Sequence, residues 1–213
     1  MNKIKLLLIV ISFVQPAFAQ QKYGTELVLD IVIPAGSQAK YFNTGAGVTG
    51  GFFYDIESNI RLGLSIAYIR IGADNKEIRN YYQTLVSEGD LTMTGSIRVL
   101  PVNITFKLIS PPGKQRFYGL IEGGLFTYWI KASGNYFNNG GNVIIDKSEF
   151  RSEPGFALGV GTLFRIEEAL SLDVNVKYQF VQDSEYINIG NNKISTSRLI
   201  IIGAGLNWNF NIE

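Results

Sequence analysis

The sequence contains no cysteine and no histidine. Without cysteine the chain forms no disulfide bond and has no thiol nucleophile. Without histidine it lacks the side chain that most often serves as general base and as metal ligand. Charged residues are also scarce, at 17% of the chain, whereas aromatic residues reach 13%. We therefore expect a structural or binding protein rather than an enzyme, with no cofactor.

The N-terminal segment has the features of a secretory signal peptide. Lys3 and Lys5 give a positive start, residues 6–14 form a short apolar run, and "AFA" at 17–19 supplies a small-x-small cleavage site. The apolar run is too short to span a bilayer. We predict that residues 1–19 are a signal peptide, cleaved near Ala19 in an exporting bacterium.

The remaining chain is close to electrically neutral. Loss of Lys3 and Lys5 would leave 17 of the 19 basic residues, against 18 acidic residues. This balance gives no reason to expect a nucleic-acid partner. Residues 20–213 are predicted to form one domain, because β-barrels of this length are commonly single units.

Eight segments of this domain alternate between apolar and polar residues. The clearest is "LSLDVNVKYQF" at 170–180, in which every second residue is apolar. A period of two residues is typical of a β-strand with one face of each kind. The other apolar faces begin at residues 27, 46, 62, 100, 117, 156 and 200.

The connections between these segments alternate in length. The short ones are 56–59, 110–114 and 166–169, and the long ones are about 35–44, 70–92, 131–153 and 181–197. Short turns at one end and long loops at the other are typical of an outer-membrane barrel. We predict an all-β fold, an eight-stranded up-and-down antiparallel transmembrane β-barrel with four long external loops and three short periplasmic turns.

The residues on the polar strand faces indicate whether these faces point to bulk water or into the barrel. Glycine recurs on them, as at Gly155, Gly159 and Gly161. Glycine weakens a strand, and a water-facing strand surface normally carries longer side chains. A cramped barrel interior, by contrast, has room for little else. The pattern favours polar faces turned inward and apolar faces turned to outer-membrane lipid. A soluble lipocalin-like ligand-binding barrel remains an alternative.

Aromatic residues gather at the strand ends, as expected where rings sit at headgroup level. One predicted belt holds Tyr54, Phe106, Phe117, Phe164, Trp208 and Phe210, and the other holds Tyr68, Trp129, Phe156, Tyr178 and Phe180.

Charged residues of both signs lie on the polar faces. The predicted interior polar network consists of Glu26, Asp30, Asp55, Arg61, Lys107, Glu122, Arg165, Asp173 and Lys177. Because buried charge is costly unless paired, we expect these groups to plug a narrow lumen. The inward glycines leave room for water, so a narrow passive channel for ions or small solutes is the alternative.

Other motifs carry little chemistry. "GAGVTG" at 45–50 matches Gly-x-Gly-x-x-Gly, but a strand pattern follows it where a dinucleotide site needs a helix. Asp146, Glu149 and Glu153 offer oxygen ligands, but not at the spacing of a known calcium loop. We predict no catalytic, cofactor-binding or metal-binding residue.

The long connections are where specific recognition is expected. Residues 77–86 and 134–146 combine Tyr, Phe and Asn, which suit ligand binding. The same composition suits strands that extend as a hairpin, with "NNGG" at 138–141 as the turn. We therefore expect the protein to have a structural or surface-interaction role and to be a monomer. The sequence does not identify an external ligand.

Three stretches stand out, "RVLPVNITFKL" (98–108), "RFYGLIEGGLFTYW" (116–129) and "GFALGVGTLFRIEEALSLDVNVKYQF" (155–180). Together they resemble the PorT-like, or "porin family", outer-membrane barrel domain. The resemblance spans 22–210 and extends more loosely to eight-stranded barrels of the OmpA and OmpX type. It implies a cell-envelope location and insertion by the barrel-insertion machinery, which recognises the C-terminal strand. Such barrels often end on an aromatic residue, whereas here Phe210 is followed by Asn211, Ile212 and Glu213.

Overall fold

The computed structural model describes residues 22–36, 39–77, 90–138, 141–181, 187–189, 192–194 and 198–211. The predicted signal peptide lies outside the described residues. Within the described ranges, no helix is long and apolar enough to cross a membrane.

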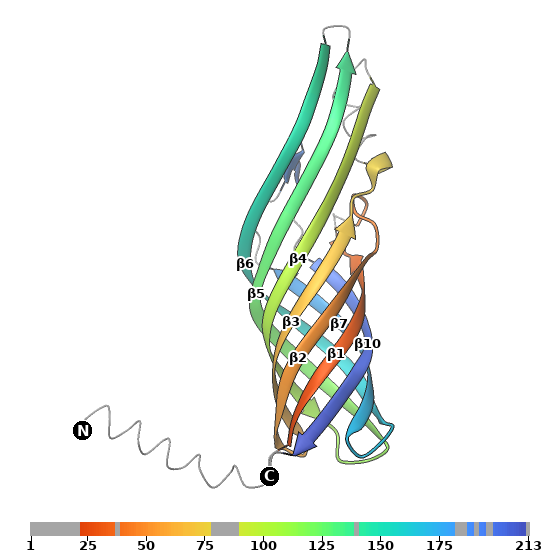
Figure 1. Ribbon diagram of the computed structural model, residues 1–213, viewed down its shortest axis with the longest axis vertical. Coiled ribbons are helices and arrows are strands. Elements are labelled where there is room, and N and C mark those ends of the chain that lie inside the picture. Colours follow the sequence, from red (N-terminus) through yellow and green to blue (C-terminus); the bar gives the residue numbers. More distant parts are fainter. Residues whose placement is uncertain are drawn as a thin grey trace, which may run out of the picture.

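Eight long strands close into one antiparallel barrel (Figure 1). They are β1 (Lys22–Pro34), β2 (Gly45–Glu57), β3 (Ile60–Gly72), β4 (Asp90–Ile109), β5 (Gln115–Asn138), β6 (Gly141–Arg165), β7 (Leu170–Val181) and β10 (Arg198–Asn211). Each strand pairs with its neighbours along the chain, and β1 closes the barrel against β10. A small separate hairpin of β8 (Ile187–Ile189) and β9 (Asn192–Ile194) lies between β7 and β10. The predicted eight-stranded up-and-down barrel is confirmed.

The predicted loop at 131–153 is wrong. β5 and β6 stay paired without interruption from Gln115↔Phe164 to Asn138↔Gly141, and β4 pairs with β5 from Asp90 onward. The hydrogen-bonded ladder continues through this stretch, although its residues no longer alternate strictly between apolar and polar. Strands β4, β5 and β6 therefore rise well beyond the other five barrel strands (Figure 1), and we call this extension the protruding sheet. This is the hairpin that the "NNGG" alternative anticipated.

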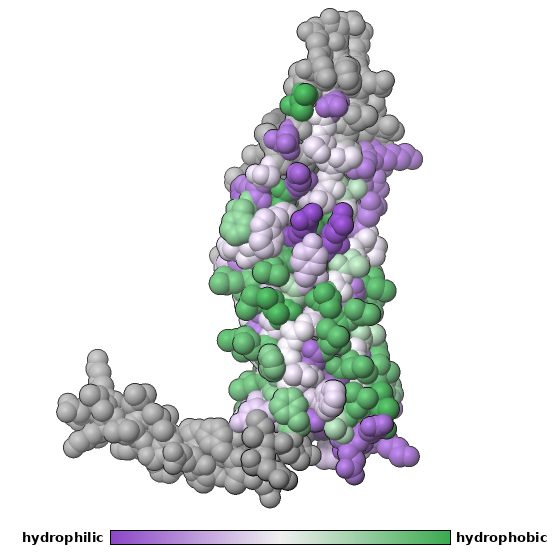
Figure 2. Space-filling model, in the orientation of Figure 1, coloured by the Kyte–Doolittle hydropathy of each residue, from purple (hydrophilic) through white to green (hydrophobic). Residues whose placement is uncertain are grey.

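The outward faces of the barrel strands are apolar and exposed. Leu29 and Phe52 are each 68% exposed and Ile104 is 67% exposed, and all eight barrel strands carry exposed apolar residues of this kind. On the face that Figure 2 shows, they form an apolar band. Contiguous apolar surface of this extent marks a membrane or protein contact rather than a surface that faces water. This surface favours the membrane barrel over the soluble lipocalin-like alternative.

Inward glycines allow large side chains to fill the lumen. Strands β2 and β6 each present three glycines to the inside, while β5 presents bulky residues such as Tyr118, Phe126 and Tyr128. A Cβ atom at Gly161 would collide with the Tyr118 ring, and one at Gly155 would lie against the Phe126 ring. The small faces of two strands thus accommodate the large faces of the others.

Candidate functional site

The barrel interior has a polar half and an apolar half. The polar half lies toward the short turns and holds charged residues from β1, β2, β3, β4, β5 and β7. The apolar half lies toward the protruding sheet. One strand contributes to both halves. On β4, the inward side chains of Lys107 and Asn103 lie in the polar half, and those of Val99 and Ile97 lie in the apolar half.

Asp173 is the centre of the polar half. It is fully buried, and its carboxylate accepts hydrogen bonds from Tyr118 Oη at 2.5 Å and from Asn207 Nδ2 at 3.1 Å. Lys107 Nζ lies 3.5 Å from Asp173 Oδ2 and donates to Glu26 Oε2 at 2.8 Å. One ammonium thus bridges two carboxylates that come from β1 and β7.

Arg61 anchors the end of the network nearest the short turns. Its Nε donates to Asp55 Oδ1 at 2.6 Å and its Nη2 to Asp55 Oδ2 at 3.0 Å, which makes the ion pair bidentate. Its Nη1 donates to Asn207 Oδ1 at 2.8 Å, and the guanidinium stacks 3.5 Å from the centroid of the Phe53 ring. Asn207 therefore links Arg61 to the Asp173 group.

A second ion pair lies closer to the apolar half. Lys177 Nζ is 3.4 Å from both carboxylate oxygens of Glu122. Asp30 accepts a hydrogen bond from Thr49 Oγ1 at 2.5 Å, while its other oxygen has no hydrogen-bond partner among the described residues. Buried side-chain atoms of Asn103, Asn175 and Gln179 are likewise unpaired there. The network is therefore less completely satisfied where it meets the apolar half.

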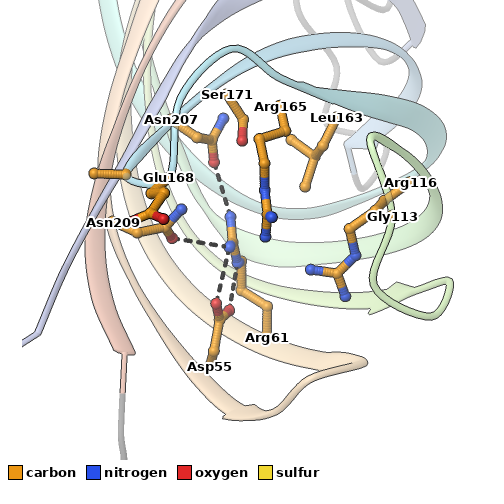
Figure 3. A pocket seen from close by; sticks show the side chains of 11 residues that line it. Asp55, Arg61, Gly113, Arg116, Leu163, Arg165, Glu168, Ser171, Asn207 and Asn209 are labelled. Carbon is orange, nitrogen blue, oxygen red and sulfur yellow. Dashed lines mark hydrogen bonds and ion pairs between the residues drawn. The ribbon is translucent and has the colours of Figure 1, made fainter.

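A cavity of about 470 Å³ opens at the short-turn end and is lined in part by Arg61 (Figure 3). Arg116 and Arg165 also line it, and Figure 3 shows Arg165 reaching into it from the end of β6. The Arg116 guanidinium donates to the backbone carbonyls of Ser110 and Ser58, so it ties two turns together. The cavity is an open vestibule whose floor is the Asp55–Arg61 pair.

The apolar half forms a plug that closes the lumen. Its members are Val32, Tyr41, Phe42, Ile69, Ile71, Ala73, Ile97, Val99, Phe126, Tyr128, Ile130, Val181, Leu199 and Ile201. A cavity lined by Phe42, Ile97, Tyr128 and other described residues of this apolar plug measures about 10 Å³, at the lower limit for a single water molecule. Val99 and Phe126 are fully buried. The plug therefore interrupts any water path along the barrel.

Tyr41 and Phe42 cap the apolar plug from the β1–β2 connection. Phe42 bridges to Ala73 beyond the end of β3, Asn43 N donates to Gly72 O at 2.9 Å, and Asp74 N donates to Tyr41 O at 2.7 Å. These backbone hydrogen bonds hold the two aromatic rings over the barrel end. A polar loop was predicted here, so the capping role was not anticipated.

The structure brings eight of the nine predicted interior residues together, and Arg165 is the exception. The eight are Glu26, Asp30, Asp55, Arg61, Lys107, Glu122, Asp173 and Lys177, all buried or half-buried. Arg165 lies on the inward side of β6, but β6 ends there and the side chain is exposed in the vestibule. It forms no ion pair with any described residue.

All eleven residues of the predicted aromatic belts lie on outward faces. Tyr54, Tyr178 and Phe180 are half-buried, and the others are exposed. Phe156 stacks on Phe180 with ring centroids 4.8 Å apart. Phe150, which sequence reasoning placed in a loop, joins the outer belt through an edge contact with Trp129 at 5.3 Å.

Sequence reasoning missed Tyr118, Asn207 and the apolar plug. The plug had a signal in the sequence. Near the outer strand ends the alternation gives way to residues that are apolar on both faces, as in "LIII" at 199–202 and "LFTYWI" at 125–130. Such runs indicate a strand buried on one side and facing lipid on the other. Within the described ranges, no group of three or more acidic side chains is placed to hold a metal ion.

No model of a known protein family matches the sequence, and no curated protein sequence matches it. Solved structures match its fold. A major outer membrane protein from Thermus thermophilus is 14% identical with a TM-score of 0.54, covering 89% of this chain and 99% of that one. The N-terminal β-barrel domain of Pseudomonas aeruginosa OprF is 13% identical with a TM-score of 0.48, covering 89% and 97%. Ail, the attachment invasion locus protein of Yersinia pestis, is 15% identical with a TM-score of 0.47, covering 90% and 98%. The Thermus match supports the barrel fold, while membership of the PorT-like family stays a prediction.

Proposed function

We propose that this chain is a bacterial outer-membrane barrel with a sealed lumen, whose functional surface is the protruding sheet of β4, β5 and β6. The observation that carries this proposal is the apolar plug. Because it interrupts the water path, the barrel serves to anchor and display rather than to conduct.

The apolar band supports the membrane location. Aromatic residues flank the band at both strand ends, as rings do at the two interfaces of an outer-membrane barrel. The short turns and the ends of β1 and β10 lie at one end (Figure 1), which is the periplasmic end in barrels of this kind. The protruding sheet would then stand outside the cell.

The interior network supports a structural role over a catalytic one. Glu26, Asp55 and Asp173 are each bound by a cation, and Asp30 and Glu122 lie above them toward the closed end. Asp55 lines the vestibule, but both of its carboxylate oxygens are held by Arg61. The proposed role is accordingly non-enzymatic and needs no cofactor. A monomeric state and insertion through the C-terminal strand remain part of the proposal.

The protruding sheet offers a polar surface for recognition. On one face Thr94 and Ser133 lie opposite each other with hydroxyls 3.0 Å apart. Exposed hydroxyls and aromatic rings on a rigid sheet suit contact with polar surface ligands. A structural or surface-interaction role through this sheet is the function that the geometry supports best.

The test is the conductance of the folded, signal-free barrel in a planar bilayer, with a large porin as positive control. Folding is verified first by a heat-modifiable gel shift in detergent. We expect no discrete current steps. Reproducible steps would instead support the narrow channel, and their selectivity would be for cations, because five carboxylates face three cations in the lumen. A protein that stays soluble and monomeric without detergent would overturn the membrane location.

A further inference from the structure

Two arginines lie side by side on the outer surface of the barrel, just beyond the apolar band. Arg70 on β3 and Arg98 on β4 are exposed, face outward and are directly paired in register. One row further out, Lys131 on β5 is exposed opposite Ser96. We call Arg70, Arg98 and Lys131 the basic patch.

Among the described residues, the basic patch has no counter-charge of its own. None of its three residues forms an ion pair with a described residue. Like charges directly opposite each other across two strands are destabilising. Glu149 lies near the patch, but its carboxylate is bound by Arg151. The pairing of Arg70 with Arg98 therefore favours an anion supplied from outside the chain.

The surroundings of the basic patch place it at the membrane interface. In register, Arg98 is followed around the barrel by Trp129 and then by Phe150, and Tyr68 precedes Arg70 on β3. The next rows toward the short turns contain Leu100 and then the exposed apolar residues Val102 and Leu125. Figure 2 shows the apolar band giving way to hydrophilic residues above it. Aromatic rings at this level mark the depth of lipid headgroups.

A groove of about 470 Å³ runs over this surface. Its lining includes Tyr68, Ser96, Arg98, Trp129, Lys131 and Phe150. Guanidinium groups bind phosphate oxygens in bidentate fashion, and the aromatic rings can cover the apolar part of a headgroup. The exposed leucine and valine side chains below the groove would meet the acyl chains of the same molecule.

We propose that the basic patch binds a phosphorylated headgroup of an outer-leaflet lipid. The proposal rests on the membrane location and orientation given under the proposed function. The proposed lipid would bind on one side of the barrel only. On the opposite side, formed by β1, β7 and β10, the outward faces carry a single described cation near their outer ends, Arg198. The barrel would hold its lipid along β3, β4 and β5, beneath the protruding sheet.

The two tryptophans of the chain allow a direct test. Trp129 borders the basic patch and Trp208 lies in the opposite belt, so W208F leaves Trp129 as the only tryptophan. The W208F barrel is folded in lauryldimethylamine oxide and titrated with lipid A, a glycolipid that carries two phosphates. We expect a saturable change in Trp129 emission that dephosphorylated lipid A and inorganic phosphate do not produce.

Charge-matched variants test whether the basic patch is responsible. R70Q/R98Q in the W208F background should weaken lipid binding about 25-fold, since each basic side chain near an anionic membrane contributes roughly five-fold. K114Q/R198Q removes the same charge from a periplasmic turn and from the strand opposite β4, and should bind as W208F does. Raising the salt to about 0.5 M should weaken binding by W208F more than binding by R70Q/R98Q, which keeps only Lys131 of the basic patch.

The outcomes separate this inference from the proposed function. Failure of the wild-type chain to fold into phosphatidylcholine vesicles would contradict the proposed membrane location itself. A barrel that folds there but shows no saturable response to lipid A would overturn the basic patch alone. Equal loss of binding in R70Q/R98Q and K114Q/R198Q would also overturn it, because attraction would then depend on net charge. Saturation with inorganic phosphate would assign the patch to a soluble anion instead.

Discussion

Asp55 holds Arg61 through both carboxylate oxygens, at 2.6 Å and 3.0 Å, at the boundary between the lumen and the periplasmic vestibule. The two residues are partners across the β2–β3 hairpin, and the guanidinium continues to Asn207 on β10. One side chain thus joins a local hairpin to the strand that closes the barrel.

Replacement of Arg61 by methionine should destabilise the barrel by about 3 kcal/mol, because it leaves a largely buried carboxylate without its counter-charge. Urea unfolding of the vesicle-inserted barrel, followed by the gel shift, measures the change. Arg165→Met is the matched control, since Arg165 is exposed and forms no ion pair with a described residue. Its effect should stay within about 0.5 kcal/mol. Equal effects of the two substitutions would remove the ion pair from the account of stability.

Neighbouring glycines on β5 should respond in opposite ways to alanine. A Cβ atom at Gly124 would collide with the backbone carbonyl of Val102, whereas one at Gly123 meets nothing within 4 Å. We expect Gly124→Ala to cost about 1–3 kcal/mol, because a backbone atom cannot give way as a side chain can. Gly123→Ala should be neutral or slightly stabilising, since alanine reduces the freedom of the unfolded chain. Urea unfolding measures both variants. Equal stability of Gly124→Ala and Gly123→Ala would show that β4 and β5 lie further apart than they do in the structure.

The apolar plug should contribute strongly to stability. Phe126→Ala would leave a cavity in a fully buried position and should cost about 3–5 kcal/mol. Phe117→Ala removes the same atoms from an exposed outward position on the same strand and should cost much less. Current recordings of Phe126→Ala should stay silent, because Lys177 and Glu122 still fill the lumen beside it. Comparable losses for the two phenylalanines would show that the plug is loosely packed.

Arginine on the apolar band should hinder insertion in a depth-dependent way. Ile104→Arg places a charge on an exposed apolar position in the middle of β4 and should cost about 2–4 kcal/mol. Thr94→Arg lies on the same face of the same strand beyond the band, where the cost falls to about 0–1 kcal/mol. Folding yield into phosphatidylcholine vesicles measures both. If Ile104→Arg inserts as well as Thr94→Arg, the face that carries Ile104 does not contact lipid.

Much of the fold followed from local patterns. Alternation predicted all eight barrel strands and the side that each turns outward, and the short connections lie where turn residues placed them. The largest error concerned the outer half of the β5–β6 hairpin, because polar residues such as Asp146 and Ser148 were taken as a loop. Above the membrane both faces of a strand meet water, so polarity no longer distinguishes strand from loop there.

The candidate site was predicted less completely, because its chemistry depends on partners. The sequence placed Asp173 and Lys107 on inward faces, but they are 66 residues apart and meet only because β4 and β7 face each other across the lumen. The sequence likewise predicted that Arg165 and Arg61 both belong to the interior network, although Arg165 is exposed in the vestibule and Arg61 is buried.

By itself, therefore, the sequence determined the number of strands, their lipid-facing side and the tight turns, since each depends on residues that are neighbours along the chain. Only the tertiary structure decided which charges pair, where the lumen is blocked and which three strands stand above the rest. Those properties arise when barrel closure brings distant strands within the reach of a side chain, and a period of two residues carries no information about that distance.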